Sequence, residues 1–191
     1  MFAEILKGST LSAHASLEKK LIVHIKSVRS TADYVGLLLL LYPFHFYTGK
    51  LLRDFSIDIG AGIADLARAG YIRADLQRFG VSIENETFRM PELPLVDSPE
   101  SVLGIRYVLE GSTLGGQIIT RILSSALQID SESGFSFFNP YRSETAANWQ
   151  RFKSDLNSAA EKLDQQKIIS AANNFFNSYN QWIRLHEPVG N

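Results

Sequence analysis

Three glycines near the centre of the chain are the first residues whose spacing suggests chemistry. Gly111, Gly115 and Gly116 fall in the run GSTLGG, inside a segment that otherwise has the pattern of one long helix. Each glycine costs a helix about 1 kcal/mol relative to alanine, so three of them need a reason. Gly111 and Gly115 share a face because residues four apart are neighbours on a helix. Either another helix packs closely there, or a flat ligand lies against bare backbone.

A histidine near the N-terminus is the second candidate. His14 follows Lys7 by seven residues, so the two lie on one side of a helix. Glu18 is four residues further on and can reach the imidazole. A metal-bound imidazole usually donates its other N–H to a carboxylate, a carbonyl or water, which suits this pair. A lone histidine on an amphipathic helix is more often a surface residue, and His45, in the aromatic run FHFY, is expected to be a hydrogen-bonded core histidine.

Two cations later in the chain form the third candidate. Arg151 and Lys153 bracket Phe152 and follow Trp149 in the run NWQRFK. On an ordinary amphipathic helix both cations would simply be solvated. The functional alternative is charge-assisted binding of the carboxylates of a ligand.

Composition excludes several classes of function. The chain has 191 residues and no cysteine, which predicts one domain over residues 1–191 and excludes disulfides and thiolate-bound metals. A formal net charge of −1 argues against a mainly electrostatic nucleic-acid binder. No signal peptide is recognisable, and the apolar stretch 34–47 is too short to span a bilayer, so we expect a cytoplasmic protein with no membrane partner.

The elements that must position these residues are helical almost throughout. Apolar spacings of three and four predict an all-α domain of seven or eight helices. Ser98, Pro99 and Glu100 form a typical helix start, from which the glycine-containing helix should run to about Leu127. Gly70 and Gly80 are expected to stop helices. The other expected helices cover residues 6–21, 31–55 (capped by Ser30 or Thr31 and bent near Pro43), 63–79 (as one or two short helices), 143–163 and 166–185, with loops over 81–97 and 130–142.

Taken together, these segments resemble the haem oxygenase family. The stretch from Leu6 to Glu18 is similar to the family's proximal-helix motif, and Tyr107 to Gln117 is similar to the distal helix of its bacterial branch. The run FFNPY at 137–141, followed by Trp149 and Phe152, also resembles that branch, which includes enzymes that supply bilin to bacterial phytochromes. The similarity covers nearly the whole chain.

The resemblance implies a role for each candidate. His14 would be the axial ligand of the haem iron, with Glu18 as the partner of its ring. Lys7 would pair with one haem propionate. Arg151 or Lys153 would hold propionates from the later helix, with Lys153 the better match by position. The remaining implied groups are the distal glycines Gly111, Gly115 and Gly116, whose backbone would lie over the haem face, and Arg106, Tyr107 and Tyr141 as helpers without a firm match.

One position departs from the pattern of many family members. Animal enzymes commonly have an aspartate just after the first distal glycine, where it orders water, whereas this chain has Ser112. Some bacterial members also have serine there. The water network would then be built from the hydroxyl of Ser112 or Thr113, from backbone carbonyls, or from Gln117.

The implied reaction is the oxidative opening of haem to biliverdin, with release of carbon monoxide and iron. Haem is both substrate and cofactor, and O2 and external electrons are consumed. Because no flavin or nicotinamide fingerprint is present, a ferredoxin or a flavoprotein reductase is expected to supply the electrons, guided by a basic rim that includes Lys19 and Lys20. A bilin-accepting phytochrome is a further implied partner. The alternatives are a non-catalytic haem carrier or sensor on the same fold, and a helical interaction domain that binds no haem.

Overall fold

The computed structural model describes residues 1–55, 68–84 and 86–186. Those residues form six α-helices and one 3-10 turn, with no strand among them, which confirms the predicted all-α class. The elements are α1 (Phe2–Ser27), α2 (Thr31–Asp54), α3 (Arg68–Arg78), α4 (Pro99–Leu127), η2 (Arg142–Glu144), α5 (Thr145–Ala159) and α6 (Gln165–Arg184).

Two predicted helix starts are confirmed by their caps. The Ser30 side chain accepts a hydrogen bond from the backbone N–H of Asp33, whose carboxylate accepts from the backbone N–H of Ser30 at 2.9 Å. Ser98 and Ser101 form the same reciprocal arrangement at the start of α4, and Pro99 occupies the first turn. Each cap satisfies backbone donors that a helix start leaves without partners.

The segment before the extended loop differs from the prediction. Gly70 was expected to stop a helix, but α3 continues through it from Arg68 to Arg78. A single glycine lowers helix stability by about 1 kcal/mol, which does not break a helix whose apolar face is buried. The described residues between 68 and 79 therefore hold one helix, and the predicted start at Ile63 lies outside the described residues. Gly80 does end the helix, with a φ of +78° that suits glycine.

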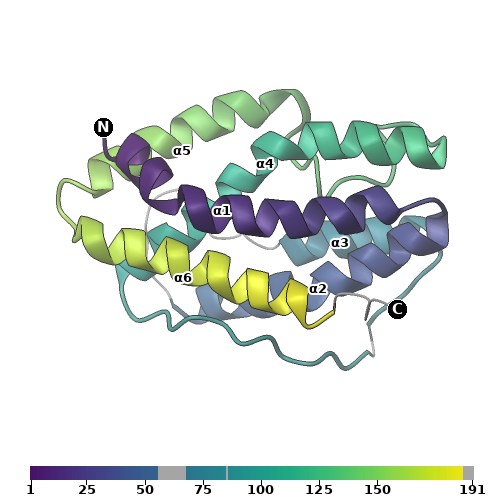
Figure 1. Cartoon of the computed structure of the whole chain (residues 1–191), viewed down its shortest axis with the longest axis horizontal. Helices are drawn as coiled ribbons and strands as arrows, with labels where there is room; N and C mark the ends of the chain where they lie inside the picture. The colour runs from purple at the N-terminus through teal and green to yellow at the C-terminus, as the bar shows by residue number, and fades with distance from the viewer. Residues whose placement is uncertain (56–67, 85, 187–191) are drawn as a thin grey trace.

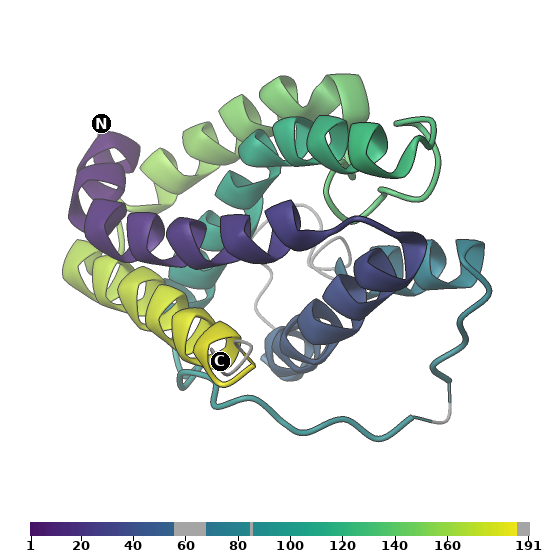
Figure 2. The same ribbon diagram turned by 45° about the vertical axis from the view of Figure 1, so that its right-hand side comes forward.

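The helices lie around α1, which crosses the middle of the molecule in Figure 1. Helix α4 packs against α5 and α6, α1 packs against α6, and α2 packs against α3. In the turned view of Figure 2 the extended segment that precedes α4 runs along the outside of the bundle. Gly104 permits the close contact between α4 and α6, because a Cβ there would lie 2.7 Å from the backbone nitrogen of Ala172.

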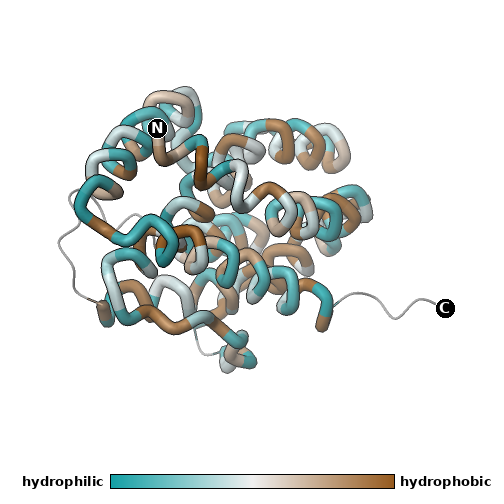
Figure 3. The backbone as a smooth tube through the Cα atoms, turned by 60° about the vertical axis from the view of Figure 1, so that its left-hand side comes forward, coloured by the Kyte–Doolittle hydropathy of each residue, from teal (hydrophilic) through white to brown (hydrophobic). Residues whose placement is uncertain are grey.

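Helix α2 is the most apolar element. Among the described residues it is the one helix with the length and hydropathy to cross a membrane, yet 56% of its most apolar window is buried inside the fold. The buried core helix of a water-soluble protein has the same properties. Figure 3 shows polar and apolar residues alternating along the other helices, as expected for amphipathic helices around a shared core.

Candidate functional site

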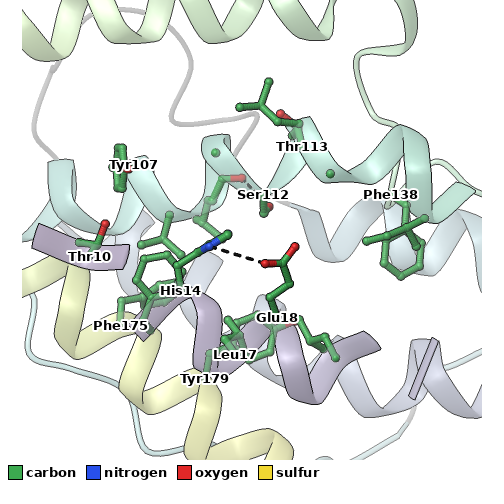
Figure 4. Close-up of a pocket in the computed structure, with 18 of the residues that line it drawn as sticks. Thr10, His14, Leu17, Glu18, Tyr107, Ser112, Thr113, Phe138, Phe175 and Tyr179 are labelled. Carbon is green, nitrogen blue, oxygen red and sulfur yellow. Dashed lines mark hydrogen bonds and ion pairs between the residues drawn. The ribbon is translucent and has the colours of Figure 1, made fainter. Parts of the chain in front are cut away.

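A cavity of about 550 Å³ lies between α1 and α4. This volume is in the range of small-molecule sites. Figure 4 shows its side chains: His14, Leu17 and Glu18 come from α1, Ser112 and Thr113 from α4, and Phe175 and Tyr179 from α6. The wall is predominantly apolar and aromatic, with a few polar groups, which is the usual make-up of a cofactor or ligand pocket.

Helix α1 brings His14 and Glu18 to this cavity as predicted. Nδ1 of His14 lies 3.9 Å from a carboxylate oxygen of Glu18, which is the ion pair drawn in Figure 4. This distance suits an electrostatic contact or a bridging water better than a direct hydrogen bond. Because Nδ1 faces Glu18, Nε2 is the nitrogen left for a metal. The imidazole is half exposed and packs edge-on against Phe176, with ring centroids 5.6 Å apart.

Asparagines of neighbouring helices fix the position of α1. Asn173 donates to the carbonyl of Ser9 at 3.2 Å, and Asn180 donates to the carbonyl of Ala13 at 3.4 Å. At the N-terminus the backbone N–H of Ala3 donates to the side chain of Asn157 at 2.9 Å. These contacts hold the backbone of α1 that leads up to His14 against α5 and α6.

The glycines of α4 divide between the two explanations offered by the sequence. Gly111 and Gly115 line the cavity, and a Cβ at Gly115 would meet nothing within 4 Å. Gly116 lies outside the cavity wall, where a Cβ would fall 1.6 Å from the carbonyl oxygen of Phe138. Gly115 therefore leaves room on the ligand side, and a Cβ at Gly111 would contact the ring of Trp149 at 3.7 Å. Gly116 instead allows backbone-to-backbone contact with the loop that precedes η2.

Lys7 and Lys153 both line the cavity, from α1 and α5 respectively. The ammonium group of Lys153 lies 5.9 Å from the ring centre of Trp149, which in turn packs against Tyr107. Tyr107 and Thr10 lie together at one end of the cavity, and Phe138 lies at the other end (Figure 4). Arg151 is exposed, donates to Asn148 at 3.2 Å and is outside the cavity wall.

A buried arginine that the sequence analysis missed adds a polar group beside the glycine helix. Nη1 of Arg68 donates to the hydroxyl of Ser112 at 2.8 Å, and Nη2 lies 3.6 Å from a carboxylate oxygen of Glu110. The hydroxyl of Tyr141 donates to the same carboxylate at 3.1 Å. Burial lowers the pKa of Arg68, and the nearby Glu110 carboxylate opposes that shift. Arg68 lines the cavity, and its Nη2 is buried and makes no hydrogen bond within the described part of the chain, with Glu110 as its charged neighbour.

His45 is the core histidine that the sequence predicts, and it also lines the cavity. Its Nε2 forms a 3.0 Å hydrogen bond with the hydroxyl of Tyr179, and its ring packs edge-on against Phe137. Burial, together with the charge of Arg68, lowers the pKa of His45 to about 3. The imidazole is therefore neutral near pH 7.

The other groups suggested for the water network lie as follows. The Thr113 hydroxyl is in the cavity wall and donates to the carbonyl of Glu110 at 2.6 Å. Gln117 donates to the carbonyl of Arg142 at 2.9 Å, outside the cavity wall. Arg106 is buried, with its guanidinium 5.5 Å from the ring centre of Phe152. Ser112, through Arg68, is thus the hydroxyl with a charged partner.

Fold and cavity together define an all-helical protein with an apolar slot between a histidine-bearing helix and a glycine-bearing helix. The sequence matches the family model described as Heme oxygenase over residues 1–185. The chain therefore belongs to the heme oxygenase family, and this membership assigns to it the oxidative breakdown of haem.

No curated protein sequence matches the chain. Among solved structures, the NO- and CO-bound heme oxygenase from Neisseria meningitidis is similar to it, with a TM-score of 0.78 and 22% sequence identity. The match covers 97% of this chain and 91% of that chain. At this level of identity the likeness shows that the fold is shared.

Proposed function

We propose that the cavity between α1 and α4 binds haem. The ring would enter the slot by one edge, with His14 on one of its faces and the backbone of Gly111 and Gly115 on the other. The observation that carries the proposal is the pairing of the two walls: on α1 an imidazole whose Nδ1 already faces a carboxylate, and on α4 a stretch where Gly111 and Gly115 carry no side chain. Haem bound there supplies the iron at which O2 is activated. The protein has to hold the ring, orient it and provide polar donors on the glycine side.

Lys7 and Lys153 are the groups we propose for the haem propionates. Lys7 precedes Thr10 by three residues on α1, and Lys153 approaches Trp149, which packs on Tyr107. Both lysines are thereby associated with the Tyr107 and Thr10 end of the slot, and Phe138 lies at the opposite end (Figure 4). This asymmetry favours a bound ring whose charged edge would lie at the lysine end and whose apolar edge would lie against the aromatic end. Ring rotation, and with it the carbon at which the macrocycle opens, would follow from these contacts.

Arg68 and Ser112 are the groups we propose for the distal polar network. Ser112 both accepts from Arg68 and donates to the carbonyl of Leu109, so its hydroxyl is fixed in orientation. The second guanidinium nitrogen of Arg68 makes no hydrogen bond among the described residues and lies 3.6 Å from the Glu110 carboxylate. An ordered water held between them would deliver protons to the reacting oxygen, the task that an aspartate performs in many relatives.

Electrons would come from a ferredoxin or a flavoprotein, which we propose docks on the surface of α1. Lys19, Lys20 and Lys26 lie on that helix beyond His14 and are at least partly exposed. The other finer predictions concern context: a single domain over residues 1–191, a cytoplasmic location, membership of the bacterial branch and supply of bilin to a phytochrome. The second candidate function, a haem carrier or sensor without turnover, is favoured by the serine at position 112 in place of aspartate.

One aerobic experiment separates these functions. Purified chain is titrated with haem, then given ascorbate and catalase under air, and spectra are recorded. Loss of the haem Soret band with growth of a biliverdin band supports the enzyme, and a stable haem spectrum identifies the carrier. His14→Ala should abolish turnover, whereas His24→Ala, on the same helix but outside the cavity wall, should leave it unchanged.

A further inference from the structure

Helix α3 carries two buried charged residues, and each of them bonds to a different segment beside the slot. Arg68 and Asp75 are seven residues apart, so they lie on the same side of the helix. Arg68 contacts Ser112 and Glu110 on α4, as described above. Asp75, only 1% exposed, faces the loop that carries Phe137 and Phe138.

The carboxylate of Asp75 is bonded to the backbone of this loop. One oxygen accepts from the N–H of Ser136 and the other from the N–H of Phe137, each at 2.9 Å. Burial raises the pKa of Asp75, and the two amide hydrogen bonds act in the opposite direction. Hydrogen bonds to an ionised group are among the stronger ones in proteins, so this contact fixes the loop backbone firmly.

The loop in turn makes three contacts that shape the slot and its surroundings. The side chain of Phe138 closes the end opposite Tyr107 (Figure 4). The ring of Phe137 packs on His45, with centroids 4.8 Å apart. The carbonyl of Phe138 contacts Gly116 so closely that no Cβ fits between them, which sets the distance between the loop and α4.

We propose that Asp75 is a positioning residue for the orientation of haem in the slot, acting through the backbone of Ser136 and Phe137. The proposal rests on the haem-binding function proposed above. When Asp75 holds the loop, Phe138 presents a fixed aromatic wall to the apolar edge of the ring. When the loop is released, the wall recedes and the ring can bind in more than one rotation. Asp75 therefore acts on the choice of the carbon that is attacked, although it lines no part of the cavity.

The test compares Asp75→Asn with Leu76→Ala, a control in the same helix. Asparagine has the shape of aspartate but only one acceptor oxygen, so one loop amide loses its partner. Leu76 is fully buried, lies outside the cavity wall and makes neither of the two amide hydrogen bonds, so its truncation destabilises the fold while the Asp75 carboxylate keeps both acceptor oxygens. Asp75→Glu keeps the charge but moves the carboxylate by one methylene group, and it replaces Asp75→Asn if that variant does not fold.

Three measurements are made on each variant. The first is amide hydrogen exchange of Ser136 and Phe137 in the haem-free chain, which should become about tenfold faster or more in Asp75→Asn. The second is the ratio of haem orientations in the ferric cyanide complex, read from the haem methyl proton resonances. The third is the ratio of biliverdin isomers after turnover. We expect both ratios to shift at least about twofold in Asp75→Asn and to stay at wild-type values in Leu76→Ala.

The outcomes are distinguishable. Faster exchange in Asp75→Asn with unchanged haem ratios would show that Asp75 is only structural and would overturn the proposal. A similar shift in Leu76→Ala would overturn it as well, since general destabilisation would then suffice. If the wild-type chain binds no haem in a titration, the proposed function itself fails, and that result is seen before any variant is compared.

Discussion

Gly115 and Gly116 are adjacent in the sequence, but their Cα atoms face different surroundings on α4. Gly115 borders the cavity with open space beyond it, whereas Gly116 lies against the carbonyl of Phe138, with no room for a single carbon atom. The same glycine run therefore contains a ligand-facing position and a packing position. Substitutions at these two sites should fail in different ways.

At Gly115 a large side chain should affect ligand binding and not folding. Gly115→Leu fills space on the haem side, so we expect haem affinity to fall by tenfold or more while the thermal unfolding midpoint of the haem-free chain stays near the wild-type value. Haem titration and thermal unfolding measure the two effects. Unchanged haem affinity would contradict the placement of haem against this face.

At Gly116 even a methyl group should disturb the fold. Gly116→Ala has to push the loop away from α4, and overpacking of this kind costs about 1–3 kcal/mol. We expect the free energy of unfolding of the haem-free chain, measured in urea, to fall by that amount. A stability equal to that of the wild type would show that the loop does not contact α4 as described.

Arg68 should matter for both stability and turnover. Arg68→Met leaves the largely buried Glu110 without its cation, and breaking such a pair costs about 3 kcal/mol. The double variant Arg68→Met/Glu110→Gln should recover much of that stability but not the turnover rate, which we expect to stay at least about tenfold low because the distal donor is lost. Urea unfolding and biliverdin formation provide the two readouts. Full activity in the double variant would remove Arg68 from the proposed distal network.

Variants of Lys153 and Arg151, two cations of α5, test whether Lys153 binds a haem propionate. Lys153 lines the cavity and Arg151 does not. Lys153→Gln should weaken haem binding by about tenfold, as expected for the loss of one charge-assisted contact, and should broaden the distribution of biliverdin isomers. Arg151→Gln should leave both properties unchanged. Equal effects in the two variants would point to the general charge of the surface instead.

Charge reversal on α1 tests the docking of an electron donor. Lys19→Glu/Lys20→Glu should lower ferredoxin-supported turnover about tenfold at low ionic strength, since steering by complementary charge acts mainly on association. Ascorbate-supported turnover should not change. Lys162→Glu/Lys167→Glu alters net charge equally and is the control, because Lys162 lies in the α5–α6 connection and Lys167 in the first turn of α6. Loss of rate in both pairs would refute a specific docking surface on α1.

His45 should make the chain sensitive to acid. Its folded-state pKa of about 3 is below the unfolded value of 6.5, so the unfolded chain binds the extra proton and stability falls as pH decreases through this window. Between pH 6.5 and pH 5 one such group costs about 2 kcal/mol. His45→Gln should lose less stability than the wild type over this range, as measured by urea unfolding. An identical acid dependence in both chains would mean that His45 is not held neutral in the fold.

Much of the fold follows from local signals in the sequence. The hydroxyl caps at Ser30 and Ser98 mark real helix starts, because capping depends only on the next three residues. The helix from Pro99 to Leu127 follows equally from its apolar spacing. Gly70 was misjudged because a glycine stops a helix only where the packing does not favour continuation, and packing is a property of the whole chain.

Local sequence signals likewise predict some residues of the candidate site and not others. His14, Glu18 and Lys7 share one helix face, so their spacing alone predicts that they lie together. Arg68 and Asp75 carry no local signal: a buried ion pair and a carboxylate bonded to distant amides exist only after α3 has docked on α4 and the loop. The sequence also cannot separate Gly115 from Gly116, since their roles depend on where Phe138 lies.

A crystal structure of the haem complex is the most direct test of whether haem lies between His14 and the backbone of α4. We expect electron density that joins Nε2 of His14 to the iron. Gly111 and Gly115 should lie across the opposite face of the haem ring, and the propionates should point toward Lys7 and Lys153. Haem bound at another surface, or iron held by a residue other than His14, would contradict it.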